Sequence, residues 1–503
     1  MKLDQNQIRS YRTEHEMKLR GSRTVCRVIT EEVPFADEQG ETAATAFLYT
    51  YLGNGGEGAP VIFAFNGGPG SSCVWEHLGL FGAVRVTLND STNPSLFAPY
   101  ELEDNPYCLL DCCDVVMIDP PGCGYGRLLK PEAGGSFFGV CEDAKCMADL
   151  IEDWLIRYGR IESPKYLAGE SYGTIRSCML LSELMGGPMS VGRRLRAIPI
   201  DGVIMLGTAI CMDYFHNRPA VEEAVLQLPG MACVNLYHHP LDEVKKQEWT
   251  AWGLPVPDCA AETADIAWKF AGEQYLPALF QGSGLSEDKR RLLVRQMSLL
   301  TGVEEAWFER HGLNLPVDVF LSEVLAGKGK DAGAYDGRYT MRHLDPVQMK
   351  DPVADDPAMG KYTAAFIGAM NGKMKEYLGL EEMNRAYDSI DFEVNGRWNY
   401  QTPRTPTECL EWAMRRNEGL RVFFGSGLYD MVTPPGTVRY LQKHLALPKE
   451  RVTVKEYESG HMPYLGDEPA GRLYKDLREF ILQADKTFAS TGGEYAGAHL
   501  KLS

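Results

Sequence analysis

The serine at position 171 lies in a pattern that is typical of a catalytic nucleophile. The segment is Gly169-Glu170-Ser171-Tyr172-Gly173, and it directly follows the apolar run Tyr166-Leu167-Ala168. Glycines two residues before and after a serine leave room for a tight strand-to-helix turn, which exposes the hydroxyl at the end of a strand. The N-terminus of the next helix favours negative charge nearby. The motif alone also fits an ordinary turn serine, so a base, an orienting acid and an oxyanion hole must come from elsewhere.

Two later segments offer the acid and the base. Asp430 follows the apolar run 421–425, and His461 follows the alternating run 452–457. Ligands of open α/β sheets bind outside the carboxyl ends of the strands, so these side chains are expected to meet the elbow there. His461 would accept the Ser171 proton and return it to the leaving group, while Asp430 would hold the imidazole tautomer. The chain order Ser171, Asp430, His461 is that of α/β-hydrolase triads.

A glycine-rich loop is the candidate oxyanion hole. The segment Asn66-Gly67-Gly68-Pro69-Gly70-Ser71-Ser72 follows the apolar run 61–65. An oxyanion hole of this type takes one N–H from the residue after the nucleophile and one from an early loop. Tyr172 and Gly68 fit these two positions. Because Gly67 and Gly68 lack side chains, the backbone can approach a bound carbonyl closely.

The apolar pattern predicts the elements that position these residues. Residues 13–51 alternate as antiparallel strands do, and continuous apolar runs at 61–65 and 115–118 are typical of strands buried on both faces. Residues 200–207 are expected to form another interior strand. Between residues 141 and 158 the apolar positions form one helical stripe, and an amphipathic helix is expected at about 471–487. Strands that alternate with helices predict a doubly wound, mostly parallel sheet of the α/β class.

One long segment breaks this alternation. From about 211 to 396 the chain has helical and irregular patterns, many aromatic residues and no run typical of a buried strand. Because the segment is too long for a loop within a compact sheet, we interpret it as an inserted, mainly helical cap domain. We therefore predict an α/β-hydrolase core in two parts, residues 1–210 and 397–503, with the cap at 211–396.

Composition limits the partners and the compartment. The 503 residues carry a net charge of −18, which repels nucleic acid and anionic membrane surfaces. No apolar stretch has the length of a signal peptide or a membrane span, so we predict a cytoplasmic protein. Thirteen cysteines are an odd number, and a reducing compartment would keep all of them as thiols. Cys108, Cys112, Cys113 and Cys123 lack C-x-x-C spacing and a nearby histidine, so we expect buried thiols rather than a metal site, and no cofactor.

Taken together, these motifs resemble those of the serine carboxypeptidase family. The resemblance rests on the glycine loop 66–72, the elbow 169–173, Asp430 with Thr433-Pro434, and Gly460-His461-Met462, in order and over nearly the whole chain. The segment His77-Leu78-Gly79-Leu80, with Thr174 and Arg176, looks most like the bacterial branch. The resemblance implies an α/β-hydrolase sheet with an inserted cap and no metal. It also implies removal of single residues from peptides with a free C-terminus.

The same resemblance implies a role for the acid beside the nucleophile. In the family, the residues that match Asn66, Gly67 and Glu170 bind the terminal carboxylate of the substrate. A hydrogen bond between a carboxylate and a carboxylic acid needs one shared proton, so binding should weaken as Glu170 ionises. Peptidase activity is therefore expected to favour mildly acidic pH.

The sequence also departs from the family. Many eukaryotic members carry a second glutamate where this chain has Leu80, and often a cysteine where it has Ser71. Glu76 lies one helical turn before Leu80, and we hypothesise that it takes the place of the missing glutamate, in which case Glu76→Gln should shift the acid limb of activity. The alternatives to a carboxypeptidase are an acyltransferase or esterase on the same scaffold, or a non-catalytic peptide-binding relative. Side-chain preference and oligomeric state stay open.

Overall fold

The computed structural model describes residues 1–53, 56, 58–88, 92–186, 196–211, 220–343, 351 and 353–490. The predicted start of the cap at residue 211 borders residues 212–219, which lie outside the described residues. None of the helices within these ranges is long and apolar enough to cross a bilayer.

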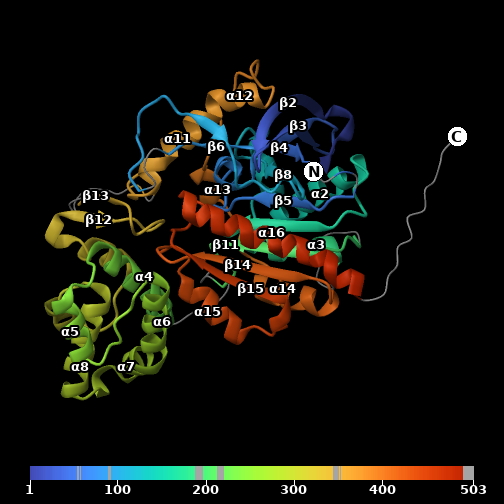
Figure 1. Ribbon diagram of the computed structural model, residues 1–503. Helices are drawn as coiled ribbons and strands as arrows, with labels where there is room; N and C mark the ends of the chain where they lie inside the picture. The colour runs from blue at the N-terminus through green and yellow to red at the C-terminus, as the bar shows by residue number, and fades with distance from the viewer. Residues whose placement is uncertain are drawn as a thin grey trace.

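An eleven-stranded sheet forms the centre of the molecule (Figure 1). Its strands follow the order β1 (Lys2–Leu3), β3 (Ser22–Ala36), β4 (Thr42–Leu52), β8 (Asp114–Asp119), β5 (Val61–Phe65), β10 (Lys165–Glu170), β11 (Gly202–Leu206), β14 (Arg421–Gly427) and β15 (Val452–Tyr457). Two further strands, β2 (Arg9–Leu19) and β9 (Arg127–Leu128), pair with β3 and β4. The strands up to β4 pair antiparallel, and all neighbours from β8 to β15 are parallel.

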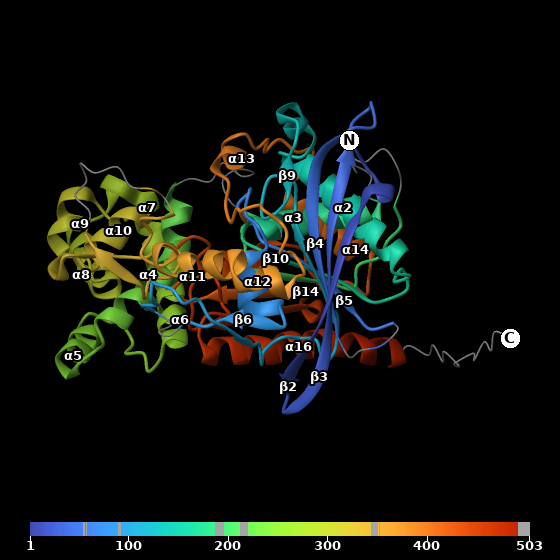
Figure 2. The same cartoon turned by 90° about the horizontal axis from the view of Figure 1, so that it is seen from above.

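Helices cover both faces of this sheet, because the central strands are apolar on both sides. One apolar cluster joins the sheet to α2 (Val140–Arg157), α3 (Tyr172–Met185), α14 (Pro406–Arg416) and α15 (Pro435–His444). A second cluster joins the opposite face to α1 (Val74–Glu76), α11 (Met359–Asn371), α12 (Lys373–Tyr377) and α16 (Asp467–Ser490). Figure 2 shows α2 and α3 on one side of the strands and α16 on the other. The predicted doubly wound α/β architecture is confirmed.

The register of the parallel strands brings their carboxyl ends to one edge. Gly169 of β10 lies opposite Phe65 of β5 and Met205 of β11. The loops that follow β5, β10 and β11 therefore begin next to one another at this edge of the sheet. The loops after β14 and β15 leave the sheet at the same edge, because both strands continue the parallel order.

The long segment between β11 and β14 is mainly helical. It contains α4 (Ala220–His238), α5 (Glu243–Ala251), α6 (Ala260–Phe270), α7 (Leu276–Gln281), α8 (Glu287–Thr301), α9 (Glu305–His311), α10 (Val317–Glu323), the short pair β12 (Lys330–Ala332) and β13 (Thr340–Arg342), then α11, α12 and α13 (Phe392–Gly396). Helices α4 to α10 share an apolar cluster of their own and stand beside the sheet in Figure 2. Helices α11 and α12 instead pack into the cluster of the sheet. The exact cap boundaries stay a prediction.

Candidate active site

Ser171 occupies a strained turn between β10 and α3. Its φ of 58° and ψ of −124° are rare for a residue with a side chain. The Ser171 N–H donates to the Leu206 carbonyl at 3.0 Å, and the Thr174 hydroxyl donates to the Ser171 carbonyl at 2.6 Å. A Cβ at Gly169 would lie 2.2 Å from the Gly173 carbonyl oxygen, so this turn needs glycine there. Close packing of strand and helix thus presents Ser171 at the carboxyl edge of the sheet.

Asp430 and His461 come together at this edge as a hydrogen-bonded pair. His461 Nδ1 lies 2.9 Å from Asp430 Oδ2, and both side chains are buried. Asp430 also accepts from the Val432 N–H at 2.8 Å, the Thr433 N–H at 2.9 Å and the Thr433 hydroxyl at 2.5 Å. The carboxylate is therefore held from several sides, as an orienting acid requires.

His461 and Ser171 line the same cleft. A Cβ at Gly207 would lie 2.9 Å from His461 Cε1, so the imidazole lies directly on this glycine. Burial lowers the pKa of His461, but the charge of Asp430 and the hydrogen bond to it outweigh burial and leave the pKa raised. Because Nδ1 is bonded to Asp430, Nε2 is the nitrogen available to Ser171, which lines the same cleft.

The glycine loop after β5 packs directly on the elbow. A Cβ at Gly67 would lie 2.4 Å from the Tyr172 nitrogen and 2.7 Å from the Glu170 carbonyl oxygen. Gly68 has a φ of +99° and lines the cleft together with Ser171. Among the described residues, no backbone carbonyl accepts from the N–H of Gly68 or of Tyr172. Both predicted oxyanion donors are thus available beside Ser171.

The predicted carboxylate-binding residues lie next to this loop. Asn66 Nδ2 donates to Glu170 Oε1 at 2.8 Å, and Asn66 Oδ1 accepts from the Glu76 N–H at 3.2 Å. Glu170 is 3% exposed, and its Oε2 has no hydrogen-bond partner among the described residues. The predicted set Asn66, Gly67 and Glu170 is therefore gathered at one end of the cleft, with a carboxylate oxygen still unpaired.

Glu170 is a weak acid in this position. Burial raises its pKa to about 7, and the charge of Asp430 contributes in the same direction. The charge of His461 and the polar groups of Tyr464 and Asn66 act against this rise. Near neutral pH the side chain can therefore hold or lose its proton.

Glu76 lies close to Glu170 at the end of α1. It is fully buried, and neither carboxylate oxygen has a hydrogen-bond partner within the described ranges. Burial raises its pKa strongly, the charge of Glu170 raises it further, and Arg176 partly opposes both. Leu80, in contrast, lies in the apolar cluster beside the sheet. This arrangement supports the hypothesis that Glu76 takes the place of the missing second glutamate.

The role of one ion pair escaped the sequence analysis. Arg176 on α3 is buried, and its Nε lies 2.7 Å from Asp143 on α2. Its Nη1 donates to the carbonyl of Asn66. The pair therefore fixes the backbone that presents the Asn66 side chain. The sequence signal was an arginine within a largely apolar helix. The partner of this arginine, Asp143, lies on another helix and could not be identified from sequence.

The walls of the cleft come largely from the long helical segment. Met462 lines the cleft, together with Trp75, Tyr335, Met359, Tyr362 and Ile390. The Tyr335 carbonyl accepts from the His461 N–H at 2.6 Å, and the Tyr335 ring lies 5.3 Å from the imidazole. These residues carry no local motif, so their place in the site could not be read from sequence. Ser71 accepts from the Trp75 indole N–H at 3.1 Å, so it positions one wall.

Comparisons with known proteins agree with this geometry. The family model described as serine carboxypeptidase matches residues 37–472. No match was found among curated proteins. Among solved structures, the chain is similar to Kex1(delta)p, a prohormone-processing carboxypeptidase from Saccharomyces cerevisiae, with a TM-score of 0.55, 12% identity, and coverage of 92% of this chain and 91% of that chain.

A weaker likeness extends to other hydrolases. A proline iminopeptidase from Mycobacterium smegmatis matches with a TM-score of 0.36 and 12% identity, over 91% of this chain and 99% of that chain. A carboxyl esterase from Bacillus coagulans matches with a TM-score of 0.36 and 12% identity, over 90% and 98%. At 12% identity the likeness to Kex1(delta)p supports the fold alone, whereas the family model matches most of the chain. The chain belongs to the serine carboxypeptidase family and is a serine-type hydrolase with the α/β-hydrolase fold.

Proposed function

We propose that this carboxypeptidase uses Ser171, His461 and Asp430 as its triad and Asn66, Gly67 and Glu170 to bind the terminal carboxylate of a peptide. The observation that supports this most directly is the position of a buried acid, Glu170, immediately before the nucleophile in the chain. An endopeptidase or esterase has no need for such a group. A peptide with a free C-terminus would bring its carboxylate to this acid and its last peptide bond to Ser171.

The reaction follows from this placement. Ser171 Oγ attacks the last peptide carbonyl while His461 Nε2 takes the hydroxyl proton, and the N–H groups of Gly68 and Tyr172 stabilise the oxyanion. His461 then gives the proton to the amine of the departing amino acid. Water attacks the acyl-enzyme with His461 again as base, and the shortened peptide leaves.

The pKa of Glu170 sets the expected pH dependence. A protonated Glu170 donates a hydrogen bond to the substrate carboxylate, while an ionised one repels it. Because burial raises this pKa to about 7, binding of free acids should weaken as the pH rises through about 7. His461 must be neutral to act as base, so activity also falls at low pH.

We also propose that the protein works in a reducing compartment such as the cytoplasm, on peptide substrates. All thirteen cysteines are free, and all except Cys259 are buried. Burial raises the pKa of several of these thiols, among them Cys73 and Cys123, which keeps them protonated and unreactive. This pattern supports structural thiols rather than disulfides. The likeness to the bacterial branch stays a prediction.

The test compares a blocked dipeptide with its C-terminal amide across pH, using wild type and Ser171→Ala. The free acid should be cleaved faster below about pH 7, and this preference should fade above it. Ser171→Ala should lose activity on both substrates, by about 10⁴-fold or more. Equal rates on acid and amide at every pH would contradict the carboxylate-binding role. Undiminished turnover by Ser171→Ala would contradict the triad.

A further inference from the structure

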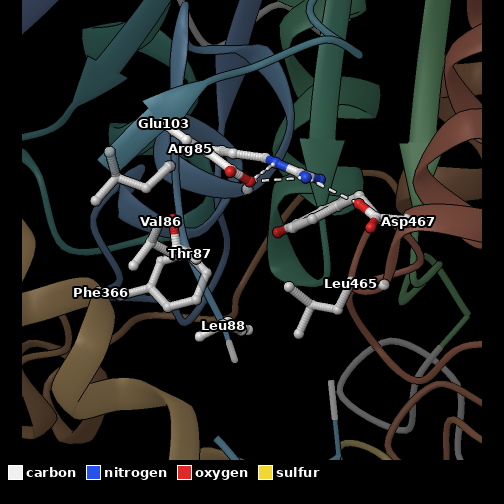
Figure 3. Close-up of a pocket in the computed structure, with 12 residues that line it drawn as sticks. Arg85, Val86, Thr87, Leu88, Glu103, Phe366, Leu465 and Asp467 are labelled. Atoms are coloured by element: carbon white, nitrogen blue, oxygen red, sulfur yellow. Dashed lines mark hydrogen bonds and ion pairs between the residues drawn. The ribbon is translucent and has the colours of Figure 1, made fainter. Parts of the chain in front are cut away.

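A second and larger cavity lies beside the active-site cleft, and the mechanism above makes no use of it. Figure 3 shows the residues that line it. Its volume is about 510 Å³, within the usual range of small-molecule sites. We call it the side chamber. Its apolar wall includes Leu78, Leu88, Phe366 and Leu465, and its polar wall contains Arg85, Glu103 and Asp467.

A thin aromatic partition separates the side chamber from the cleft. Tyr362 of α11 lines the cleft, and Phe366, one helical turn later, lines the chamber. Trp75 of the cleft packs against both, with its ring 6.0 Å from Tyr362 and 5.1 Å from Phe366, and these two rings lie 6.1 Å apart. Tyr464 completes the chamber wall near Glu170, three residues after His461. The chamber therefore lies behind the end of the cleft where the C-terminal residue of a substrate would sit.

The charged wall of the chamber has a defined geometry. Arg85 Nη2 lies 2.8 Å from Glu103 Oε1 and 2.8 Å from Asp467 Oδ1, as the dashed lines of Figure 3 show. Arg85 Nε also donates to Glu103 Oε1 at 2.8 Å. These contacts involve Nε and Nη2 and one oxygen of each carboxylate. Among the described residues, Nη1 and the two outer oxygens have no further hydrogen-bond partner, and the guanidinium also lies 5.2 Å from the centre of the Tyr107 ring. The Glu103 and Asp467 side chains are 45% and 74% exposed, so this wall opens to solvent.

We propose that the side chamber binds a free α-amino acid as its zwitterion. The ammonium group would lie against the outer oxygens of Glu103 and Asp467, beside the guanidinium that already joins the two acids. The carboxylate would accept from Arg85 Nη1, and the side chain would lie against Leu88, Phe366 and Leu465. The hydrolysis proposed above releases this class of molecule next to the chamber. The inference rests on the proposed function for the source of the ligand, but the binding itself needs no turnover.

Other classes of ligand fit this wall less well. An anion would meet two carboxylates beside the guanidinium, and a purely apolar molecule would cover charged groups without replacing their contacts with water. A simple amine can donate to the outer carboxylate oxygens, but it leaves Arg85 Nη1 without an acceptor. A zwitterion with an apolar side chain matches all three features of the chamber.

The test measures binding of L-phenylalanine to Ser171→Ala by calorimetry at about pH 8, where Glu170 is mostly ionised and the carboxylate site of the cleft is weakened. One amino acid per chain should bind. The double variant Glu103→Gln/Asp467→Asn should weaken binding about 10- to 100-fold, the effect of lost charge-assisted hydrogen bonds. Thr87→Trp, which fills the chamber from its wall, should do the same and serves as the second variant.

Two ligands that each carry one charge test which chemical class the chamber binds. An inhibition experiment with the active enzyme tests whether the released product is its ligand. 2-Phenylethylamine and 3-phenylpropanoate, which each keep one charge, should both bind more weakly than L-phenylalanine. In the active enzyme, L-phenylalanine should inhibit with a noncompetitive component that Glu103→Gln/Asp467→Asn removes, while the kcat/KM for the blocked dipeptide stays unchanged. Such inhibition would identify the released product as a ligand of the chamber.

Three results would overturn the proposal. The first is that L-phenylalanine does not bind at about pH 8. The second is that it still binds to both Glu103→Gln/Asp467→Asn and Thr87→Trp, and the third is that 2-phenylethylamine binds as tightly as L-phenylalanine. None of them depends on peptidase activity, so they are distinct from a failure of the proposed function, which would show as loss of the acid preference or as turnover by Ser171→Ala.

Discussion

The two ends of the active-site cleft differ in how completely their buried polar groups are paired. At the triad end, Asp430 accepts hydrogen bonds from His461, from two backbone N–H groups and from the Thr433 hydroxyl. At the carboxylate-binding end, Glu170 Oε2 and both oxygens of Glu76 are buried without partners among the described residues. The same cleft thus combines a complete network with an incomplete one.

This difference indicates how each end works. A buried polar group without a hydrogen-bond partner destabilises the fold by about 1–3 kcal/mol. Such a group in a native structure is therefore a candidate for binding a ligand that supplies the missing partner. At the triad end nothing is missing, and the geometry is preformed for proton transfer. At the other end, a proton shared between the acids and the carboxylate of a substrate would complete the network. Chemistry and substrate selection should therefore respond separately to mutation.

The largest effect is expected from Asp430→Asn, which breaks only the triad end. The amide would favour the wrong tautomer of His461 and would not stabilise its cation, so kcat/KM should fall about 10⁴-fold. The residual rates on the free acid and on the amide should keep the wild-type ratio. A changed ratio would show that the two ends are not independent.

Asn66→Ala breaks the other end. It removes the donor to Glu170 and a group proposed to bind the substrate carboxylate. We expect a loss of about 10- to 100-fold in kcat/KM on free acids, as for one hydrogen bond to a charged group, and little change on C-terminal amides. Equal losses on both substrates would instead point to a role in shaping the oxyanion loop.

Glu170→Gln changes the pH profile more than the maximal rate. Glutamine can donate a hydrogen bond to a carboxylate at any pH, so the fall in free-acid activity around pH 7 should disappear. The acid limb should stay, because it reports His461. Rate profiles from mildly acidic to mildly alkaline pH test this, with the amide substrate as control. An unchanged fall would assign the titration to another group.

Glu76→Gln has the smallest expected effect on rate and tests the carboxyl pair. Glu76 and Glu170 are buried side by side, and the charge of Glu170 raises the pKa of Glu76, so the two acids titrate as an interacting pair. Removal of one acid should therefore move the pH at which free-acid activity falls, by up to about one unit. A pH profile that coincides with that of the wild type, in the limb of either Glu170 or His461, would refute the pairing.

The same variant should alter the pH dependence of stability. In the unfolded chain Glu76 ionises near its ordinary pKa of 4.5, whereas burial raises its folded pKa well above that value. Between these two values the folded state binds more protons, so Glu76 makes the wild type less stable as pH rises. Thermal unfolding should show Glu76→Gln gaining stability over wild type from mildly acidic to mildly alkaline pH. A constant difference would mean that Glu76 titrates normally.

Much of the fold and the triad could be predicted because the signals are local. Strands buried on both faces appear as continuous apolar runs, and parallel order places whatever follows them at one edge. Ser171 directly follows such a run, and Asp430 and His461 come three and four residues after the ends of β14 and β15. Their convergence therefore required no knowledge of side-chain packing. The predicted carboxylate-binding group also came together, because Asn66 and Glu170 belong to the loop and the elbow of neighbouring strands.

Other features depend on contacts between distant segments. The Arg176–Asp143 pair joins two helices, and the aromatic partition joins Trp75 to residues nearly three hundred positions later on α11. The side chamber is formed where β6 (Val84–Val86), α11 and the start of α16 meet. No periodicity or motif in any one of these segments indicates the others.

The sequence by itself therefore determined the sheet, the nucleophile, its acid and base, and the family, because backbone geometry and short motifs encode them. Only the tertiary structure decided the burial of Glu76 beside Glu170, the walls of the cleft and the charged chamber behind it. These depend on which side chains exclude water from one another, and that is a property of packing between segments. The pKa of Glu170 belongs to the same group, since burial raises it.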